Sequence, residues 1–238
     1  MYILGIDTSS IVATTALITE EKLLCEYIVN NEKNHSEKLM GVIDQVVVDS
    51  GIDINMVDAI AVAKGPGSFT GIRIGMACAQ GIAHALKKPV IGVNTLDGLA
   101  NNLMYSTSLL CPVVDAQRGD VYSSLFKWEN GIMVRLWDYK MIRAEELVNT
   151  LLGLDEQIII MGDGSYLIKE HIRNSAKSNI TISHSAFLMP RASSIAEVGL
   201  REFQTGRFDS CFSIKPFYIR KSNAEEKWEE GHGSKGIR

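Results

Sequence analysis

The segment from Lys64 to Leu86 holds the residues best suited to anion chemistry. Its sequence is KGPGSFTGIRIGMACAQGIAHAL, in which Gly65-Pro66-Gly67 follows an apolar run and Ser68 or Thr70 is placed to cap a helix. The free N–H groups and the dipole at the start of a helix favour a bound phosphate. GPGSFTG is, however, neither a Walker A loop nor a GxGxxG fingerprint. A strand, a glycine turn and a helix are therefore predicted, and phosphate binding is one of three explanations for the glycines.

The other two explanations concern packing. Two stripes of small residues recur at four-residue spacing along the predicted helix: Gly71, Gly75 and Ala79, and Ala77, Gly81 and Ala85. Each glycine inside a helix costs about 1 kcal/mol relative to alanine, so the glycines call for a packing or binding explanation. Either one stripe lies against the chain's own sheet, or the second stripe, with Ile72, Met76 and Arg73, meets a helix of another chain.

The sequence offers little for metal or nucleophilic catalysis. The five histidines are not paired one helical turn apart: they are His35, His84, His171, His184 and His232. The four cysteines, Cys25, Cys78, Cys111 and Cys211, form no CxxC pair. Neither an HExxH pattern nor a GxSxG elbow is present, so no metal site and no peptidase chemistry are predicted.

Composition indicates a globular protein of one large domain or two ordinary ones. The chain has 238 residues, 46% of them hydrophobic, and a formal net charge of −4. This balance does not favour a protein that coats nucleic acid or a membrane surface. The start MYILGIDTSS lacks the features of a signal peptide, and no apolar run reaches about 18 residues. We therefore expect a cytoplasmic protein with reduced thiols and no membrane contact.

The elements that position these residues fall into two similar successions. In the first half, strands are predicted at 2–7, 11–19, 23–29, 59–63 and 90–93, with helices at 36–50, 68–86 and 95–105. In the second half, strands are predicted at 109–115, 121–128, 132–139, 158–161 and 180–183, with helices at 144–152, 166–173 and 193–204. The repeated order predicts a duplicated α/β fold with lobes at 1–104 and 105–220, and a flexible charged tail at 221–238.

These patterns resemble a known superfamily and, within it, one family. Two lobes of βββαβα type, each with an aspartate ending its first strand (Asp7 and Asp115), resemble the actin, Hsp70 and sugar-kinase superfamily, the actin-like ATPase (ASKHA) fold. Six segments look like the bacterial TsaB (YeaZ) family: GIDTSS at 5–10, NHSEKLM at 34–40, KGPGSFTGIRIGMACAQGIA at 64–83, VVDAQRGDVY at 113–122, GDG at 162–164 and PFYIR at 216–220. The resemblance covers residues 1 to about 220.

The resemblance implies a role in tRNA modification. Proteins of this family take part in forming N6-threonylcarbamoyladenosine beside the anticodon of tRNAs that decode codons starting with A. The resemblance implies a non-catalytic subunit that binds and activates the TsaD-like transferase and reaches the TsaE-like ATPase through the complex. It also implies a homodimer as the alternative assembly, with contact to tRNA only within the complex. TsaD-like enzymes carry an HxxxH metal pair on a helix, which this sequence lacks.

The superfamily also implies a nucleotide site, whose remnants are traceable in this sequence. Carboxylates at the ends of the first strands hold Mg²⁺, and glycine-rich or serine-rich turns cradle phosphates. The matching residues here are Asp7, Thr8, Ser9, Asp115, Gly162 and Gly164. The turn after Asp115 is the bulky Ala116-Gln117-Arg118, and Asp163 adds a negative charge. We therefore expect a vestigial site without a cofactor of its own, in which the aspartates satisfy backbone donors. Weak nucleotide binding stays open, while ATP and Mg²⁺ belong to partner proteins.

A partner interface is predicted on two helices. Leu39, Met40 and Ile43 give the first helix surplus apolar surface, and the small-residue helix supplies a flat surface beside it. The predicted interface residues are Leu39, Met40, Ile43, Gly71, Ile72, Gly75, Met76 and Ala79. They form half of a four-helix contact, which the family resemblance assigns to either the homodimer or the TsaD-like partner, so that the two assemblies exclude each other.

Two further functions are weighed against the non-catalytic subunit. The first is an ATP-dependent phosphotransferase of the sugar-kinase type that uses Asp7 and Asp115, which the missing phosphate-hairpin glycine disfavours. The second is direct RNA binding by a basic patch in the second half, made of Arg118, Arg191, Arg201, Arg207, Lys215, Arg220 and Lys221. Scattered arginines are more often simply solvated.

Overall fold

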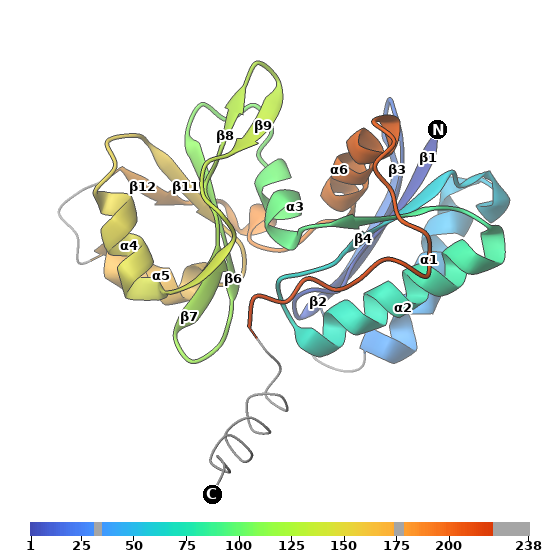
Figure 1. Cartoon of the computed structure of the whole chain (residues 1–238), viewed down its shortest axis with the longest axis horizontal. Coiled ribbons are helices and arrows are strands. Elements are labelled where there is room, and N and C mark those ends of the chain that lie inside the picture. Colours follow the sequence, from blue (N-terminus) through green and yellow to red (C-terminus); the bar gives the residue numbers. More distant parts are fainter. Residues whose placement is uncertain (31–34, 174–178, 221–238) are drawn as a thin grey trace, which may run out of the picture.

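A computed structural model describes residues 1–30, 35–173 and 179–220, with the side chains of 35–38 excepted. The described chain forms two lobes with helix α3 (Thr95–Asn101) between them (Figure 1). The predicted tail at 221–238 lies outside the described residues. In the part of the chain that is described, no helix combines the length and the apolar character needed to cross a membrane.

The first lobe is built on a five-stranded sheet in the order β3-β2-β1-β4-β5. Its strands are β1 (Tyr2–Asp7), β2 (Val12–Thr19), β3 (Leu23–Asn30), β4 (Ala59–Ala63) and β5 (Val90–Val93). Strands β1 to β3 pair antiparallel, whereas β1, β4 and β5 pair parallel. The apolar β4 is buried along its whole length, because helices cover both faces of the sheet at this strand.

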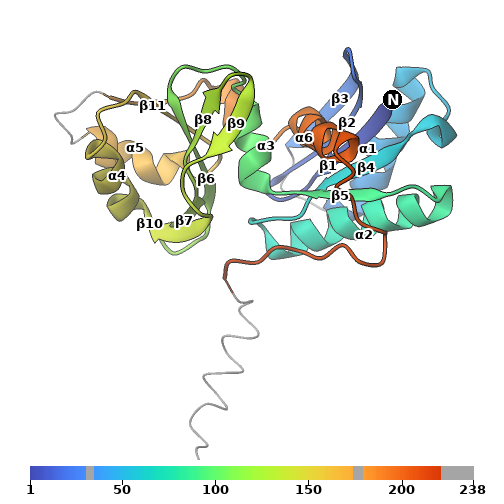
Figure 2. The same cartoon turned by 45° about the horizontal axis from the view of Figure 1, so that its top comes forward.

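Three helices cover this sheet. Helices α1 (His35–Ser50) and α2 (Phe69–Leu86) lie on one face, and α6 (Ala192–Gln204) lies on the other (Figure 2). The short 3₁₀ helix η1 (Ile54–Met56) connects α1 to β4. The alternation of side chains along β1 divides the core: Leu4 and Ile6 face α1 and α2, whereas Ile3 faces α6.

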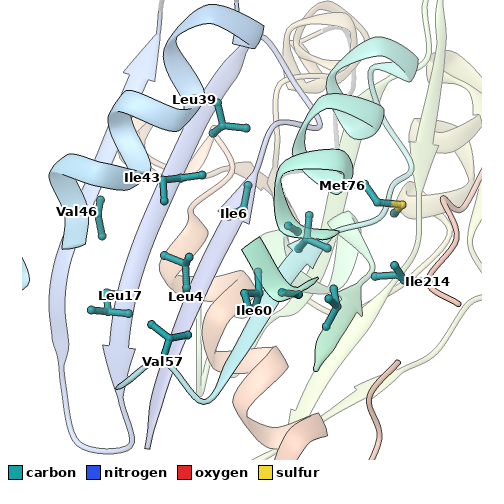
Figure 3. Close-up of a cluster of buried hydrophobic side chains, with 14 residues drawn as sticks. Leu4, Ile6, Leu17, Leu39, Ile43, Val46, Val57, Ile60, Met76 and Ile214 are labelled. Carbon is teal, nitrogen blue, oxygen red and sulfur yellow. The ribbon is translucent and has the colours of Figure 1, made fainter. Parts of the chain in front are cut away.

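A large hydrophobic core lies between the sheet of the first lobe and helices α1 and α2. Leu39, Ile43 and Val46 of α1 pack on Leu4 and Leu17 of the sheet (Figure 3). On the α2 side, the same cluster contains the following side chains: Met76, Ala79, Ala83, Ile60, Val62 and Ile214. The apolar spacing on α1 therefore serves the fold of the chain itself.

The second lobe contains a seven-stranded sheet. Its strands are β6 (Leu109–Asp115), β7 (Asp120–Ser123), β8 (Phe126–Glu129), β9 (Ile132–Arg135), β10 (Lys140–Arg143), β11 (Ile158–Met161) and β12 (Ile180–Ile182), and its helices are α4 (Ala144–Leu152), α5 (Ser165–Arg173) and the 3₁₀ helix η2 (Ser185–Phe187). The main path is β10-β7-β6-β11-β12, and β8 pairs with both β6 and β9. The predicted strand 121–128 is thus two strands, because the chain bends at Ser124, whose hydroxyl donates to the Trp137 carbonyl at 2.6 Å.

The chain returns to the first lobe after the second lobe is complete. Helix α6 packs on β1, β2 and β4, and Asp209 forms a β-bridge with Val90 of β5. The structure therefore differs from the predicted boundaries, because most of residues 192–220 lies with the first lobe and not in a second lobe of 105–220. Long-range packing of this kind leaves no local signal in the sequence.

Candidate partner interface and interlobe cleft

The structure corrects most of the predicted interface. Leu39, Ile43, Ile72, Met76 and Ala79 are buried with at most 4% of their surface exposed, and Gly71 and Gly75 are also buried. Within the predicted set of eight, Met40 is the exposed residue, with 51% of its surface accessible. The other seven residues face the chain's own core, so they are wrong as residues that contact a partner in the folded protein.

The inner glycines of α2 are explained by a close approach of the chain itself. A Cβ atom on Gly71 would lie 2.0 Å from the carbonyl oxygen of Thr8, and one on Gly75 would lie 2.3 Å from Thr8 Oγ1. The Thr8 hydroxyl donates a hydrogen bond of 2.7 Å to the Gly71 carbonyl. Gly71 and Gly75 therefore allow the turn between β1 and β2 to lie against α2, as the first packing explanation predicted.

The second small-residue stripe is the outward one. Ala77, Gly81 and Ala85 are all exposed, and a Cβ atom on Gly81 would meet nothing within 4 Å. On the neighbouring α1, Met40 and Val48 are 51% and 63% exposed. We call the exposed surface formed by these five residues the helical face. Its small and apolar composition leaves room for another helix to approach closely.

Two residues of the predicted nucleotide site, Ser9 and Asp115, line the cleft between the lobes. A cavity of about 840 Å³ opens there, lined by Ser9 and Ser68 from the first lobe and by Asp115 and Asp163 from the second. Asp7 lies behind Ser9 with 1% of its surface exposed. Ser9 and Asp115 thus line the same cavity although they come from different lobes, and a nucleotide site there stays a prediction.

The Asp7 carboxylate is held by its own chain. Its Oδ1 accepts hydrogen bonds from the Ser9 amide at 2.8 Å and from the Ser9 hydroxyl at 2.6 Å. Its Oδ2 is buried and has no hydrogen-bond partner among the described residues. Burial raises the pKa of Asp7 to about 6, although the Ser9 hydrogen bonds lower it in part.

Asp115 is likewise occupied by local donors. Its Oδ1 accepts from the Gln117 amide at 2.7 Å, and its Oδ2 accepts from the Tyr166 hydroxyl at 2.8 Å. Its own amide donates to Asp163 Oδ1 at 3.1 Å. Burial raises the pKa of Asp163 to about 6. These contacts match the alternative in which strand-end aspartates satisfy neighbouring donors.

The turns around these carboxylates do not suit a Mg²⁺–phosphate site. In the turn after Asp115, the Ala116 amide bonds to the Asp120 carbonyl and the Asp120 amide bonds to the Gln117 carbonyl, so these donors point into the turn. Gly162 (φ +107°) and Gly164 allow the next turn to pack on β6, since a Cβ on Gly162 would lie 2.0 Å from the Val113 carbonyl oxygen. Among the described residues, no cluster of three metal-ligating side chains is present.

A C-terminal segment that sequence reasoning did not place crosses this cleft. We call residues 214–220 the strap. The Phe217 amide donates to the Lys64 carbonyl at 2.7 Å, and the Tyr218 ring stacks on Phe69 with centroids 4.4 Å apart. At its end, Arg220 donates to the Ala116 carbonyl and to Asp120 Oδ2, both at 2.8 Å. The strap therefore ties α2 of the first lobe to the β6–β7 turn of the second.

The basic patch predicted for RNA is largely used within the protein. Arg191 pairs with Glu26, Arg201 with Asn101, Arg207 with Glu202 and Arg220 with Asp120. Lys215 and Arg118 are exposed, and Lys221 lies outside the described residues. Arg191, Arg201 and Arg220 thus connect elements of the fold, whereas Arg207 stays at the surface in its pair with Glu202. These pairings leave less free positive charge than the predicted basic patch assumed, and contact with RNA stays a prediction.

Comparison with known proteins finds a matching family model and many similar sequences and solved structures. A family model described as TsaD, tRNA N6-adenosine threonylcarbamoyltransferase, matches residues 22–228. The tRNA threonylcarbamoyladenosine biosynthesis protein TsaB of Bacillus subtilis (strain 168) is 32% identical over 97% of this chain and 99% of its own length. The protein of the same name from Haemophilus influenzae is 27% identical, with 97% of each chain covered.

The structural comparisons concern the fold. A crystal structure from Pseudomonas aeruginosa, described as an uncharacterized protein with similarity to peptidase YEAZ, has a TM-score of 0.80 at 23% identity and covers 92% of this chain and 99% of its own. A ROK hexokinase from Thermus thermophilus has a TM-score of 0.50 at 10% identity and covers 87% of this chain and all of its own. These likenesses confirm the predicted actin-like, sugar-kinase type of fold.

Proposed function

Because the chain belongs to the TsaB family of tRNA threonylcarbamoyladenosine biosynthesis proteins, we propose that it is a non-catalytic subunit of the enzyme complex that forms N6-threonylcarbamoyladenosine. Its partner is a TsaD-like transferase, which it binds and activates. The TsaE-like ATPase and the tRNA join through that complex. The sugar-kinase alternative has little support, because the turn donors that would hold phosphate bond within the turn.

The match to the TsaD family model does not make this chain a transferase. This chain and the transferase share a fold, but TsaD-like enzymes carry an HxxxH metal pair, and the sequence has no two histidines at that spacing. The described residues also contain no cluster of three ligating side chains. These observations support a subunit that acts on the transferase and does not replace it.

The helical face supports the mode of assembly. It is the outward side of α1 and α2, and it joins exposed Met40 and Val48 to the small residues Ala77, Gly81 and Ala85. A helix pair from a partner can pack closely on such a surface and complete a four-helix contact. We assign this face to the transferase or to a second copy of this chain, in complexes that exclude each other.

The test compares a variant of the face with a matched control. Ala77→Arg places a long charged side chain on the face, and Ala186→Arg places the same side chain on exposed η2 of the other lobe. Size-exclusion chromatography with light scattering gives the molar mass of each protein alone and mixed with the TsaD-like protein of the same organism. We expect wild type and Ala186→Arg to self-associate and to exchange into a one-to-one complex, and Ala77→Arg to remain a folded monomer in both experiments.

Two results would count against the proposal. Wild-type protein that fails to bind the transferase under every nucleotide condition would contradict the proposed function. Ala77→Arg that forms both assemblies with wild-type affinity would contradict the assignment of the helical face and leave the function standing.

A further inference from the structure

A groove lies beyond the C-terminal end of α2, where the chain passes after α6. It has a volume of about 570 Å³, and its walls include His84, Lys87 and Lys88 on one side and Phe208 and Phe212 on the other. In Figure 1 the segment after α6, coloured red, descends past β5 to this end of α2 before the strap runs back along the helix. The groove is on the far side of the first lobe from the interlobe cleft.

The aromatic wall of the groove is exposed but firmly held. Phe212 has 81% of its surface exposed and Phe208 has 53%. The backbone between them is fixed, because Asp209 exchanges hydrogen bonds of 2.8 and 3.0 Å with Val90 of β5. After Phe212, the Ser213 amide bonds to the Ser210 carbonyl at 3.1 Å. Large aromatic side chains on such a backbone lose little conformational entropy on binding and are typical anchors of protein interfaces.

The rim of the groove is positively charged. Among the described residues, neither Lys87 nor Lys88 has a hydrogen-bond or ion-pair partner for its ammonium group. The Ser213 hydroxyl contacts the one carboxylate of the wall, Asp209, at 3.4 Å. Because the carbonyl end of a helix carries negative partial charge, this end of α2 favours the lysines and disfavours a phosphate directly on the helix axis. A protein carboxylate that reaches the lysine side chains fits the rim better than a nucleic-acid backbone.

The groove is continuous with the helical face. His84 lines the groove and also lies on the exposed side of α2, between Gly81 and Ala85 on the same turn. The His84 and Phe212 rings meet edge to face with centroids 5.4 Å apart. A partner that packs along α2 therefore reaches the groove at the end of the helix without a gap.

We propose that this groove is the anchor point of the transferase subunit on the helical face. It takes an apolar side chain of the partner between Phe208, Phe212 and the end of α2, with an aspartate or glutamate beside it that pairs with Lys87 or Lys88. The inference rests on the proposed function. In this arrangement the aromatic pair supplies most of the contact affinity, and the lysines orient the partner and speed its association.

Two variants and two matched controls test the proposal. Phe212→Ala removes the most exposed ring, and the double variant Lys87→Glu with Lys88→Glu reverses the rim. Ile132→Ala removes a 66% exposed side chain from β9, and Lys22→Glu with Lys169→Glu reverses two exposed charges elsewhere. Each variant is first shown to unfold at the same midpoint as the wild-type protein. The Kd for the TsaD-like protein of the same organism is then measured by isothermal titration calorimetry at low and at high salt.

We expect the groove variants to bind the TsaD-like protein more weakly and the control variants to bind it as wild type does. Phe212→Ala weakens binding about tenfold or more at both salt concentrations. The lysine reversal weakens binding more at low than at high salt, because charge pairing is screened. Both controls stay within about twofold of wild type. Wild-type Kd values for both groove variants would overturn the inference, and if Ala77→Arg still abolished binding, the proposed function would survive.

Three other outcomes would also overturn it. Loss of binding to unmodified tRNA alone, with an unchanged Kd for the transferase, would make the groove an RNA surface. Loss of self-association alone would make it a contact between copies of this chain. Wild-type protein that never binds the transferase would remove the proposed function together with the inference.

Discussion

Asp7 occupies the position where the superfamily places a metal-binding carboxylate, but its surroundings differ from those of such a site. Two donors of Ser9 satisfy one oxygen, and the other oxygen is buried without a hydrogen-bond partner among the described residues. A buried carboxylate without a cation is most stable when it is protonated, which is why its pKa rises to about 6. The sequence predicted the strand-end position of this residue, but it did not predict how deeply the β1–β2 turn and α2 bury it.

The protonation of Asp7 gives a pH-dependent stability with a defined sign. Its pKa is raised from 3.8 to about 6 on folding, so its stabilising contribution is fully present below pH 3.8 and is lost as the pH rises through 6. Over that interval the contribution amounts to about 3 kcal/mol. Asp7→Asn keeps an oxygen for the Ser9 donors and removes the titration. Urea unfolding from pH 4 to 8 should show wild type losing about that much stability relative to Asp7→Asn.

Asp163 is present in both wild type and Asp7→Asn, and its pKa is also raised to about 6. The unfolding free energy of both proteins therefore shares the pH dependence that comes from Asp163. The informative quantity is the difference between the two unfolding free energies. If that difference were the same at pH 4 and pH 8, Asp7 would titrate alike in the folded and unfolded chains, and the raised pKa of the buried carboxyl would be contradicted.

At the scale of elements, α2 shows what a periodic pattern can and cannot establish. The spacing of small residues predicted both stripes of the helix correctly. It could not decide which stripe faces inward, because the answer depends on Thr8, a residue more than 60 positions away that contacts Gly71 and Gly75. The same limit applies to α1, where Leu39 and Ile43 follow a partner-binding pattern but fill the core of the lobe.

The two stripes should respond oppositely to the same substitution. In Gly75→Ala the new methyl group would start 2.3 Å from Thr8 Oγ1, so Thr8 must shift and weaken its bond to Gly71. We expect a loss of about 1–3 kcal/mol in the free energy of unfolding. Gly81→Ala meets nothing within 4 Å and should gain about 0.5–1 kcal/mol from helix propensity. Urea unfolding of the isolated protein measures both.

A double variant distinguishes the contact from a general effect on the helix. Thr8→Ala removes the hydroxyl that obstructs the new methyl group, so the Gly75→Ala substitution should cost less in that background than in wild type. Equal costs in both backgrounds would show that Thr8 is not the obstacle. The result also decides how interface variants are chosen, because a bulky residue at Gly75 would unfold the lobe before it could report on a partner.

At the scale of the whole molecule, the fold class and family were predictable but the path of the chain was not. The aspartate-ended strands, the repeated order of elements and the six motif segments sufficed for the fold and the family. The return of α6 to the first lobe and the strap depend on contacts between residues about 100 or more positions apart, such as Arg220 with Asp120 and Arg73 with Tyr218. Local periodicity carries no information about such pairs.

The strap should therefore stabilise the protein mainly through the guanidinium group of Arg220. Arg220 and Asp120 are 19% and 12% exposed at their side chains, so Arg220→Ala leaves a largely buried carboxylate whose remaining ion-pair partner among the described residues is the more distant Arg143, at 3.2 Å. We expect a loss of about 3 kcal/mol in the free energy of unfolding. Arg207→Ala is the matched control, because its pair with Glu202 is 65% and 35% exposed and should contribute less than about 1 kcal/mol.

Hydrogen exchange shows whether that loss arises at the junction of the lobes. In Arg220→Ala the Phe217 amide, which bonds to the Lys64 carbonyl across the start of the strap, should exchange much faster, since the end of the strap is no longer held at the second lobe. Amides of β1 and β2 in the sheet core should exchange faster only in proportion to the global loss of stability. If Phe217 and the sheet core accelerated equally, Arg220 would stabilise the protein without fastening the strap. If Arg220→Ala cost no more than Arg207→Ala, the lobes would be joined mainly by the apolar contacts of α3 with the second lobe.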